Sequence, residues 1–95
     1  MAKGYLVAHI RVNDKEGFEK FKEMVGPVIS EYGGKILVRN PKPDIREGSD
    51  SGLVIVLEFE SIDADRKFYE SDKYTKAKAV RERASDTDLI LVEGL

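Results

Sequence analysis

Residues 53–59, with the sequence LVIVLEF, form a short and almost purely apolar run. The run is rich in β-branched side chains, and Gly52 and Ser61 bound it. Such a pattern predicts a strand that is buried on both faces of a sheet. Because burying one large apolar side chain contributes about 1.5–3 kcal/mol, neither face should remain exposed to water. Other parts of the structure must therefore cover this strand from two sides.

The chain before this run predicts a strand, a helix and a second strand. Residues 5–12 alternate between apolar and mixed side chains, which is typical of a strand with one apolar face. After an Asn13-Asp14 cap, apolar residues recur at helical spacing over residues 15–32. Pro27 removes a backbone donor inside this helix, so we expect a kink or a restart there. Residues 35–40 alternate again and predict the next strand.

The remaining chain predicts a loop, an interrupted helix and a last strand. Residues 41–52 contain the prolines and glycines of an irregular segment. Ser61 or Asp63 caps the helix that follows the apolar run, and Ser71 caps its restart. Residues 89–92 close the chain as an apolar strand. One side of the restarted helix is basic, and we interpret it as solvated surface; it carries Lys73, Lys76, Lys78, Arg81 and Arg83.

The order of these elements is β-α-β-β-α-β, in which right-handed crossovers interleave the two halves. The predicted fold class is α+β: a ferredoxin-like, four-stranded antiparallel sheet with the helices on one face. We expect a single domain over residues 1–95. Since helices cover only one face, the apolar side chains of the other face need a partner. A second copy that packs sheet against sheet is the simplest partner, so we expect a homodimer.

Composition narrows the partners and the location. The chain has 16 Lys and Arg against 18 Asp and Glu, without a basic arm, so we expect no nucleic-acid partner. No apolar run reaches the roughly 20 residues that span a bilayer. The first residues also lack a signal-peptide pattern, so we expect no membrane partner and a cytoplasmic location. Cysteine is absent, His9 is the only histidine and no phosphate-binding loop occurs. We therefore expect no metal and no cofactor.

Several motifs spread over residues 4–94 resemble one known family. They are Gly4-Tyr5 with His9, Tyr32-Gly33-Gly34-Lys35, Leu37-Val38-Arg39, Glu47-Gly48, Glu58-Phe59-Glu60-Ser61, Phe68-Tyr69-Glu70-Ser71, Tyr74, Lys78, Arg81, Asp88 and Val92-Glu93-Gly94. In this order they resemble domain-of-unknown-function family 1330, of the dimeric α+β-barrel superfamily. The chain departs from the family pattern at Leu6, where an aromatic residue is common, and at Glu60, where a proline is common.

The resemblance implies the ferredoxin-like fold and dimerisation as a dimeric α+β barrel. It implies no particular activity, because none is established for the family. Proteins of similar architecture include cofactor-free monooxygenases of antibiotic biosynthesis, muconolactone isomerase and haem-dependent chlorite dismutases. Since one fold hosts many functions, this likeness alone assigns no reaction.

His9, Glu58 and Arg39 are the candidate catalytic residues. His9 lies on the mixed face of its strand, where its near-neutral titration suits a general acid or base. Glu58 is an acid in an apolar strand, so it needs a partner, and Arg39 on the next strand is a candidate. The three side chains together would form the polar centre of an apolar small-molecule site. The alternatives are a histidine with a structural hydrogen bond and a structural ion pair, and a one-residue change of register reverses the face of each side chain.

Tyr69, Tyr74 and Arg81 are the candidate substrate-binding residues. Arg81 could bind a substrate carboxylate with two hydrogen bonds, or pair with an acid such as Asp88. The tyrosines are alternatively core aromatics with a polar tip. We interpret Ser71 as a helix cap and not as a nucleophile, because nothing nearby in the sequence would activate it.

Together these observations predict a small homodimer that binds a small organic molecule. It is a candidate for a cofactor-independent acid–base enzyme of the monooxygenase or isomerase type. The alternative is a non-catalytic dimer that binds a metabolite or another protein.

Overall fold

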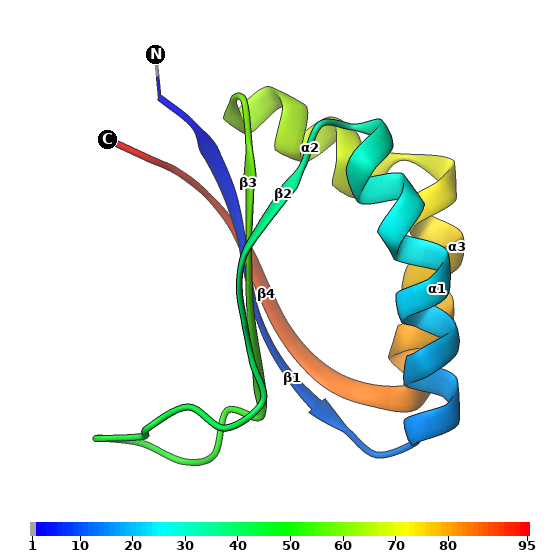
Figure 1. Cartoon of the computed structure of the whole chain (residues 1–95), viewed down its shortest axis with the longest axis vertical. Coiled ribbons are helices and arrows are strands. Elements are labelled where there is room, and N and C mark those ends of the chain that lie inside the picture. The colour runs from blue at the N-terminus through cyan, green and yellow to red at the C-terminus, as the bar shows by residue number, and fades with distance from the viewer. Residues whose placement is uncertain (1) are drawn as a thin grey trace.

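The computed structural model describes residues 2–95 and has a ferredoxin-like α+β fold. The elements are β1 (Gly4–Val12), α1 (Lys15–Glu31), β2 (Lys35–Asn40), β3 (Leu53–Phe59), α2 (Ile62–Glu70), α3 (Asp72–Ala84) and β4 (Ser85–Glu93). The strands form an antiparallel sheet in the order β2-β3-β1-β4. All helices lie on one side of this sheet (Figure 1). The predicted fold class is therefore confirmed, and β1 and β3 lie at the centre of the sheet.

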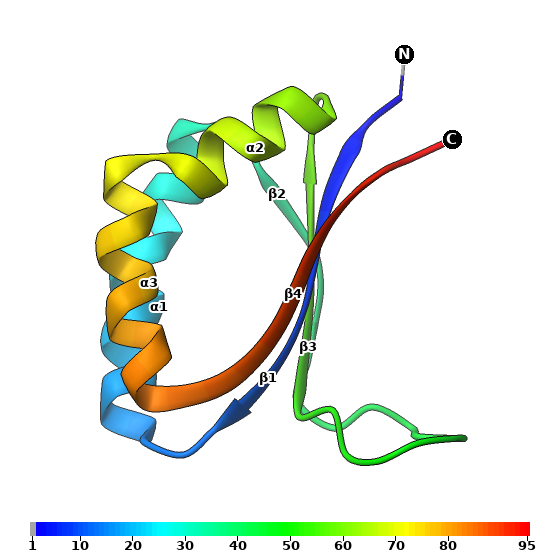
Figure 2. The same cartoon turned by 180° about the vertical axis from the view of Figure 1, so that it is seen from behind.

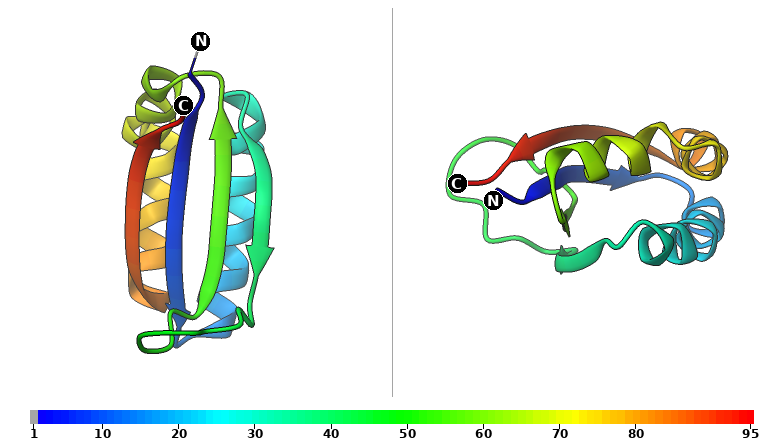
Figure 3. Two further views of the ribbon diagram at one scale, coloured as in Figure 1. Left: turned by 90° about the vertical axis from the view of Figure 1, so that its left-hand side faces the viewer. Right: turned by 90° about the horizontal axis from the view of Figure 1, so that it is seen from above.

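Alternation along the strands gives the sheet two different faces. We call the face toward the helices the covered face; it carries Leu6, Ala8 and Ile10 of β1, Leu53, Ile55, Leu57 and Phe59 of β3, and Leu89 and Leu91 of β4. We call the opposite face the open face; it carries Tyr5, Val7, His9 and Arg11 of β1, Val54, Val56 and Glu58 of β3, and Asp86, Asp88, Ile90 and Val92 of β4. Seen toward the open face, the strands lie in front of every helix (Figure 3, left).

The first helix begins and ends as the sequence predicts, but it is not interrupted. Asp14 is the N-cap, and its carboxylate accepts a hydrogen bond from the backbone N–H of Gly17 at 3.2 Å. Gly33 follows the helix with φ 74°, the left-handed conformation that ends many helices. Pro27 lies inside one continuous helix, so the expected restart does not occur.

Ser71 separates α2 from α3, as expected of a cap. Its hydroxyl donates to the carbonyl of Phe68 at 2.8 Å and accepts from the N–H of Tyr74 at 3.1 Å, so it serves both helix ends. Ser61 caps α2 in the same way, by accepting from the N–H of Ala64. Helix α2 extends from one end of the sheet toward the adjoining ends of α1 and α3 (Figures 1 and 2).

The last strand is longer than predicted, and the loop between β2 and β3 extends away from the helices (Figure 1). The last strand is longer than the predicted residues 89–92 and begins at Ser85, directly after α3. Its first residues are polar, so hydrophobicity alone could not extend it. The loop of residues 41–52 leaves the β2–β3 end of the sheet and projects beyond the open face, away from the helices (Figures 1 and 2).

Candidate functional site

A cavity of about 120 Å³ lies between the covered face and the helices. It is almost entirely apolar. The lining residues that come from the sheet include Leu6, Ala8, Ile10, Ile36, Arg39, Ile55 and Leu57, and those from the helices include Phe18, Phe21, Lys22, Val25, Gly26, Phe68, Tyr74 and Arg81. An engineered apolar cavity of roughly 150 Å³ takes up benzene, so this volume suits a molecule of about one small ring.

The sequence creates this space with a small residue at the centre of the sheet. Ala8 pairs with Ile55 on one side and with Leu89 on the other, and all three point toward the helices. A methyl group between two larger side chains leaves room above it that the helices do not fill. The lining residues Lys22 and Gly26 of α1 and Arg39 of β2 are exposed, so the cavity opens between α1 and β2.

Arg81 is the charged residue in the interior of this site. Its side chain is buried, with 4% of the residue exposed. It donates to the hydroxyl of Tyr74, and its guanidinium carbon lies 5.7 Å from the ring centre of Phe21. Within residues 2–95 no carboxylate lies within 4.0 Å of it as a salt-bridge partner, and its buried Nε has no hydrogen-bond partner. A buried cation without a counter-ion is unfavourable unless something else compensates it, so Arg81 is the principal feature of the site.

Tyr74 holds the other polar atom at the inner end of the cavity. Its ring packs against Phe68 and Tyr69, with ring centres 4.7 and 5.0 Å apart. Burial raises the pKa of Tyr74, although the neighbouring Arg81 acts in the opposite direction. The phenol is therefore neutral at neutral pH. Because its oxygen accepts the Arg81 hydrogen bond, its own proton is available to donate to a ligand.

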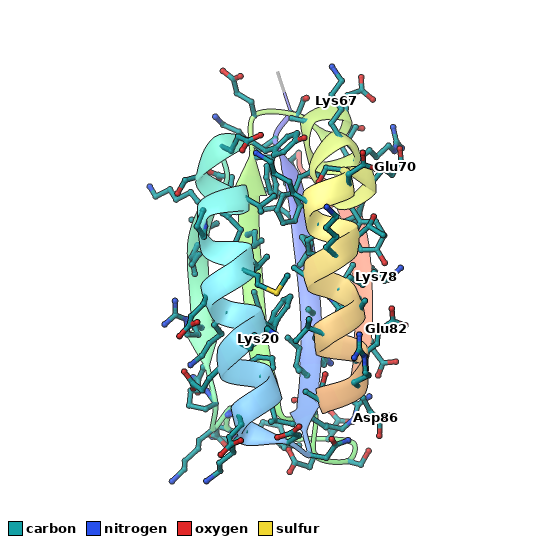
Figure 4. The ribbon with its side chains drawn as sticks, turned by 90° about the vertical axis from the view of Figure 1, so that its right-hand side faces the viewer. Lys20, Lys67, Glu70, Lys78, Glu82 and Asp86 are labelled. Atoms are coloured by element: carbon teal, nitrogen blue, oxygen red, sulfur yellow. The ribbon has the colours of Figure 1, made fainter. Side chains whose placement is uncertain are left out.

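A second, polar pocket lies on the outer side of Arg81. Its lining residues are Tyr69, Lys78, Arg81, Glu82, Ser85, Asp86, Thr87 and Leu89. Lys78 and Glu82 on α3, and Asp86 at the start of β4, follow this edge of the helical layer (Figure 4). Arg81 and Leu89 line both spaces, so Arg81 separates an apolar interior from a polar exterior.

The structure does not bring His9, Glu58 and Arg39 together. His9 of β1 and Glu58 of β3 both point to the open face, but they are not cross-strand partners. His9 pairs with Val54, and Glu58 pairs with Tyr5. Arg39 pairs with Ile55 and lines the cavity on the covered face. A register change between Ile36 and Val38 in β2 shifts its alternation, and no residue pattern in this segment indicates that bulge. The prediction that these three residues form one polar centre is therefore wrong within a single chain.

The expected ion-pair partners are also different. Glu58 accepts a hydrogen bond of 3.1 Å from the hydroxyl of Tyr5 and not from Arg39, and this bond raises the pKa of Tyr5. Asp88 pairs with Arg11 at 3.1 Å on the open face, so it is not the partner of Arg81. By contrast, the structure places Tyr74 and Arg81 on the inner cavity, and Tyr69 and Arg81 on the outer pocket.

Sequence reasoning missed the burial of two charged residues. The basic side predicted for α3 includes Arg81, yet this residue is nearly as buried as the apolar residues beside it. A signal was present, because Tyr74, Ala77, Arg81 and Ala84 follow helical spacing on one side. Asp65 is fully buried in α2, and neither carboxylate oxygen has a hydrogen-bond partner. Burial raises its pKa to about 6, and nothing in the sequence marked it.

The lining of the cavity limits the chemistry available there. Within the part of the chain that the structure describes, the lining contains no histidine and no carboxylate, so it offers no conventional general base. Residues 2–95 also hold no group of His, Cys, Asp or Glu arranged for a metal ion. No helix in this range is long and apolar enough to cross a membrane. The site can bind an apolar body, donate a proton from Tyr74 and stabilise negative charge through Arg81.

Fold and cavity together define a member of the ferredoxin-like α+β proteins with a small space between sheet and helices. Comparison with sequence families is more specific. The chain belongs to the family described as "Domain of unknown function (DUF1330)", whose model matches residues 3–95. The resemblance seen in the sequence is thereby confirmed. No curated protein matches the chain in sequence.

Solved structures of similar fold include proteins of unknown function and a cofactor-independent oxygenase. RPA0582 of Rhodopseudomonas palustris, of unknown function, has 19% identity and a TM-score of 0.80, covering 99% of this chain and 83% of its own. SnoaB of Streptomyces nogalater, a cofactor-independent oxygenase, has 13% identity and a TM-score of 0.71, covering 97% and 92%. A dimeric ferredoxin-like protein of unknown function from Thermobifida fusca has 13% identity and a TM-score of 0.67, covering 99% and 92%. At these identities the likeness shows the fold alone.

Proposed function

We propose that this protein is a homodimer that binds one small, largely apolar organic molecule in the cavity of each chain. The observation that carries the proposal is the buried Arg81, which lines an apolar cavity beside a neutral Tyr74 and has no carboxylate partner within residues 2–95. Apolar walls with a few convergent polar groups are typical of small-molecule sites. In this proposal Arg81, Tyr74 and Tyr69 form the polar end of the site.

The apolar residues of the open face support the proposal of a homodimer. Ile90, Val92 and Val38 are exposed there, and Val7, Val54 and Val56 between them are half-buried. A contiguous apolar sheet face in contact with water is unusual for a monomer. A second copy of the same sheet matches its shape and chemistry, and two neighbours of similar fold are described as dimeric. His9 and Glu58 then lie in the interface, where each remains a candidate for an architectural or a catalytic role.

The chemistry that the cavity supports is acid catalysis with stabilisation of an anion. Tyr74 can donate its proton to a ligand oxygen, while Arg81 stabilises the negative charge that develops on the ligand. A site of this kind fits a cofactor-independent isomerase or oxygenase, and SnoaB of similar fold is a cofactor-independent oxygenase. The competing function is binding without turnover, which the absence of a base among the cavity residues of the described chain favours.

Filling the cavity tests the proposal. Phenol and benzoate at millimolar concentration should raise the melting temperature of the natural protein, since ligands that bind only the folded state stabilise it. Ala8→Phe places a ring in the centre of the cavity and should abolish both shifts. Ala79→Phe introduces the same side chain on the exposed side of α3 and should leave both shifts intact.

A second variant keeps the test decisive if Ala8→Phe fails to fold. Gly26 lies in α1 at the opening of the cavity, and a Cβ there meets nothing within 4 Å. Gly26→Phe should therefore fold and obstruct entry of both probes. Shifts that persist in either cavity variant would place the binding elsewhere and contradict the proposal. Turnover is then separated from binding by following a bound phenol for chemical change under air.

A further inference from the structure

We infer that the ligand of the cavity is an organic monoanion, whose acid group lies on Arg81 and whose apolar body, of about one ring, fills the space above Ala8. This inference rests on the proposed function and adds the chemical class of the ligand. Its basis is the sign of the charges around the cavity, the lack of a counter-ion for Arg81, and the position of Arg81 between two pockets.

The charged side chains that line the cavity all have the same sign. They are Lys22, Arg39 and Arg81, and no Asp or Glu of the described chain lies among the lining residues. The whole chain is slightly acidic, with a net charge of −2, so this local excess of cations is opposite to the average. Lys22 is paired with Glu19 at 2.8 Å on the exposed side of α1, whereas Arg39 has no ion pair within residues 2–95. Cations along a low-dielectric opening attract anions and repel cations.

Arg81 forms no ion pair within residues 2–95, although Glu82 and Asp86 line the outer pocket beside it. Its hydrogen-bond partner is the neutral hydroxyl of Tyr74, and the rings of Phe21 and Tyr74 lie 5.7 and 5.9 Å from its guanidinium carbon. These contacts solvate the cation only in part, and Nε remains unpaired. A carboxylate matches the planar guanidinium in charge and in its fork of donors. Bound there, it would supply an ion-pair partner and an acceptor for Nε, neither of which residues 2–95 provide.

Arg81 also lies between an apolar space and a polar one, a position that suits a ligand with an apolar body and an acid group. The inner space is apolar and holds a body of about ring size, while the outer pocket is polar and reaches the surface between α3 and β4. Glu82 and Asp86 are among the residues that line the outer pocket, so the acid group binds Arg81 from the cavity side, where the lining holds no carboxylate, and the apolar body lies in the interior. Tyr74, whose phenol is neutral, can donate a second hydrogen bond to the same group. A ligand that carries an ammonium group would place like charge against Arg81.

The experiment compares three probes that share the same ring but differ in charge. Calorimetric titrations of the natural protein with benzoate, benzamide and benzylamine at pH 7.5 keep the ring constant. We expect benzoate to bind at least about tenfold more tightly than benzamide, which corresponds to about 1.4 kcal/mol, and benzylamine to bind most weakly. In Arg81→Met the benzoate advantage should fall to less than about twofold, while benzamide binding is retained. Arg83→Met, on the exposed side of the same helix, is the matched control and should retain the full preference.

The outcomes separate this inference from the proposed function. Benzamide or benzylamine binding as tightly as benzoate, with the effect of Ala8→Phe intact, overturns the anion class but leaves the cavity as the binding site. An unchanged benzoate preference in Arg81→Met also overturns the inference. If none of the probes binds the natural protein, both proposals fail. Since the probe comparison needs only the natural protein, it holds even if Arg81→Met does not fold.

Discussion

The two faces of the sheet come from the same strands but have different surroundings. On the covered face, Leu6 and Leu57 are buried by the helices of their own chain. On the open face, the neighbouring residues Val7 and Val56 are only half-buried, and Ile90 is 57% exposed. Both sets are equally apolar in sequence. Alternation therefore predicts the face on which a residue lies, but it does not predict whether that face is covered. The helices of this chain cover only one face.

The two faces also carry their charged groups differently. On the open face, two pairs of polar groups form within the chain, Tyr5 with Glu58 and Arg11 with Asp88. On the covered side, the buried charges of Arg81 and Asp65 have no partner of opposite charge within residues 2–95. Paired groups are expected at a permanent interface, whereas an unpaired buried cation beside a cavity is expected at a ligand site.

The largest effect should follow loss of a side chain from the covered side. Phe68 is fully buried and its ring packs against Phe59 and Tyr74 at 5.0 and 4.7 Å. Phe68→Ala should lower the free energy of unfolding by about 3–5 kcal/mol, measured by urea denaturation. Ile90→Ala on the open face is the comparison and should lower it by less than about 1 kcal/mol at concentrations where the chain is monomeric. Equal losses would contradict the distinction between the faces.

The next effect concerns assembly. Val56 lies in the middle of the open face, opposite Val7. Val56→Asp would place a carboxylate inside the proposed interface, where an unpaired charge costs several kcal/mol. We expect the dimer dissociation constant to rise at least about 100-fold, which corresponds to about 2.7 kcal/mol, in sedimentation equilibrium.

A matched variant shows whether any change in assembly is specific to that face. Lys20→Asp introduces the same carboxylate on the exposed side of α1 and should leave the dimer unchanged (Figure 4). A natural protein that sediments as a monomer at micromolar concentration would contradict the proposed interface altogether.

A third prediction concerns pH and Asp65. Burial raises the pKa of this carboxyl from 3.8 to about 6 in the folded chain. The folded state therefore holds a proton that the unfolded state has lost between about pH 4 and 6, so stability falls as pH rises through this window. The contribution lost is on the order of 3 kcal/mol. Asp65→Asn cannot ionise, so its stability relative to the natural protein should rise over the same window and remain constant above about pH 7.

Chemical denaturation at a series of pH values measures this difference. Glu70→Gln, at an exposed position of the same helix without an ion pair in residues 2–95, is the control and should not reproduce this change. A constant difference between Asp65→Asn and the natural protein from pH 4 to pH 8 would contradict the raised pKa of Asp65.

The smallest effects should come from the paired groups of the open face. Tyr5→Phe removes the hydrogen bond to Glu58 and should lower stability by about 1 kcal/mol. Arg11→Met removes an ion pair whose carboxylate is largely exposed, so it should change stability by about 0–1 kcal/mol. Thermal melts of both variants beside the natural protein give these values. A loss of stability above about 3 kcal/mol in either variant would show that these pairs stabilise the fold more than a surface hydrogen bond or ion pair does.

Most of the fold could be predicted because its signals are local. Alternation in residues 53–59, helical spacing after Asp14 and the cap at Ser71 each depend on neighbouring residues, and each matches the structure. The topology follows from the order of the elements and from right-handed crossovers, and the family resemblance implies the same fold. The polar start of β4 at Ser85 was missed because its pairing with β1 is a tertiary contact that hydrophobicity does not encode.

The candidate site was only partly predictable because it depends on which residues meet across the fold. Tyr74 and Arg81 were identified by residue type, but the burial of Arg81 follows from its place beside Ala77 and Ala84. Arg39 lies on the covered face because of the irregularity in β2. Alternation of residue types does not predict such a one-residue slip. His9 was chosen for its chemistry, yet the structure places it on the opposite side of the sheet from the cavity.

The central claim is that the covered side binds the ligand and the open side does not. Methyl-resolved NMR of the protein during a benzoate titration tests it directly, because both faces carry labelled side chains. We predict saturable shifts for the methyl groups of Leu6, Leu57 and Leu89, with those of Val7 and Val56 unchanged. Saturable shifts confined to Val7 and Val56, or no saturable shift on either face, would contradict the account.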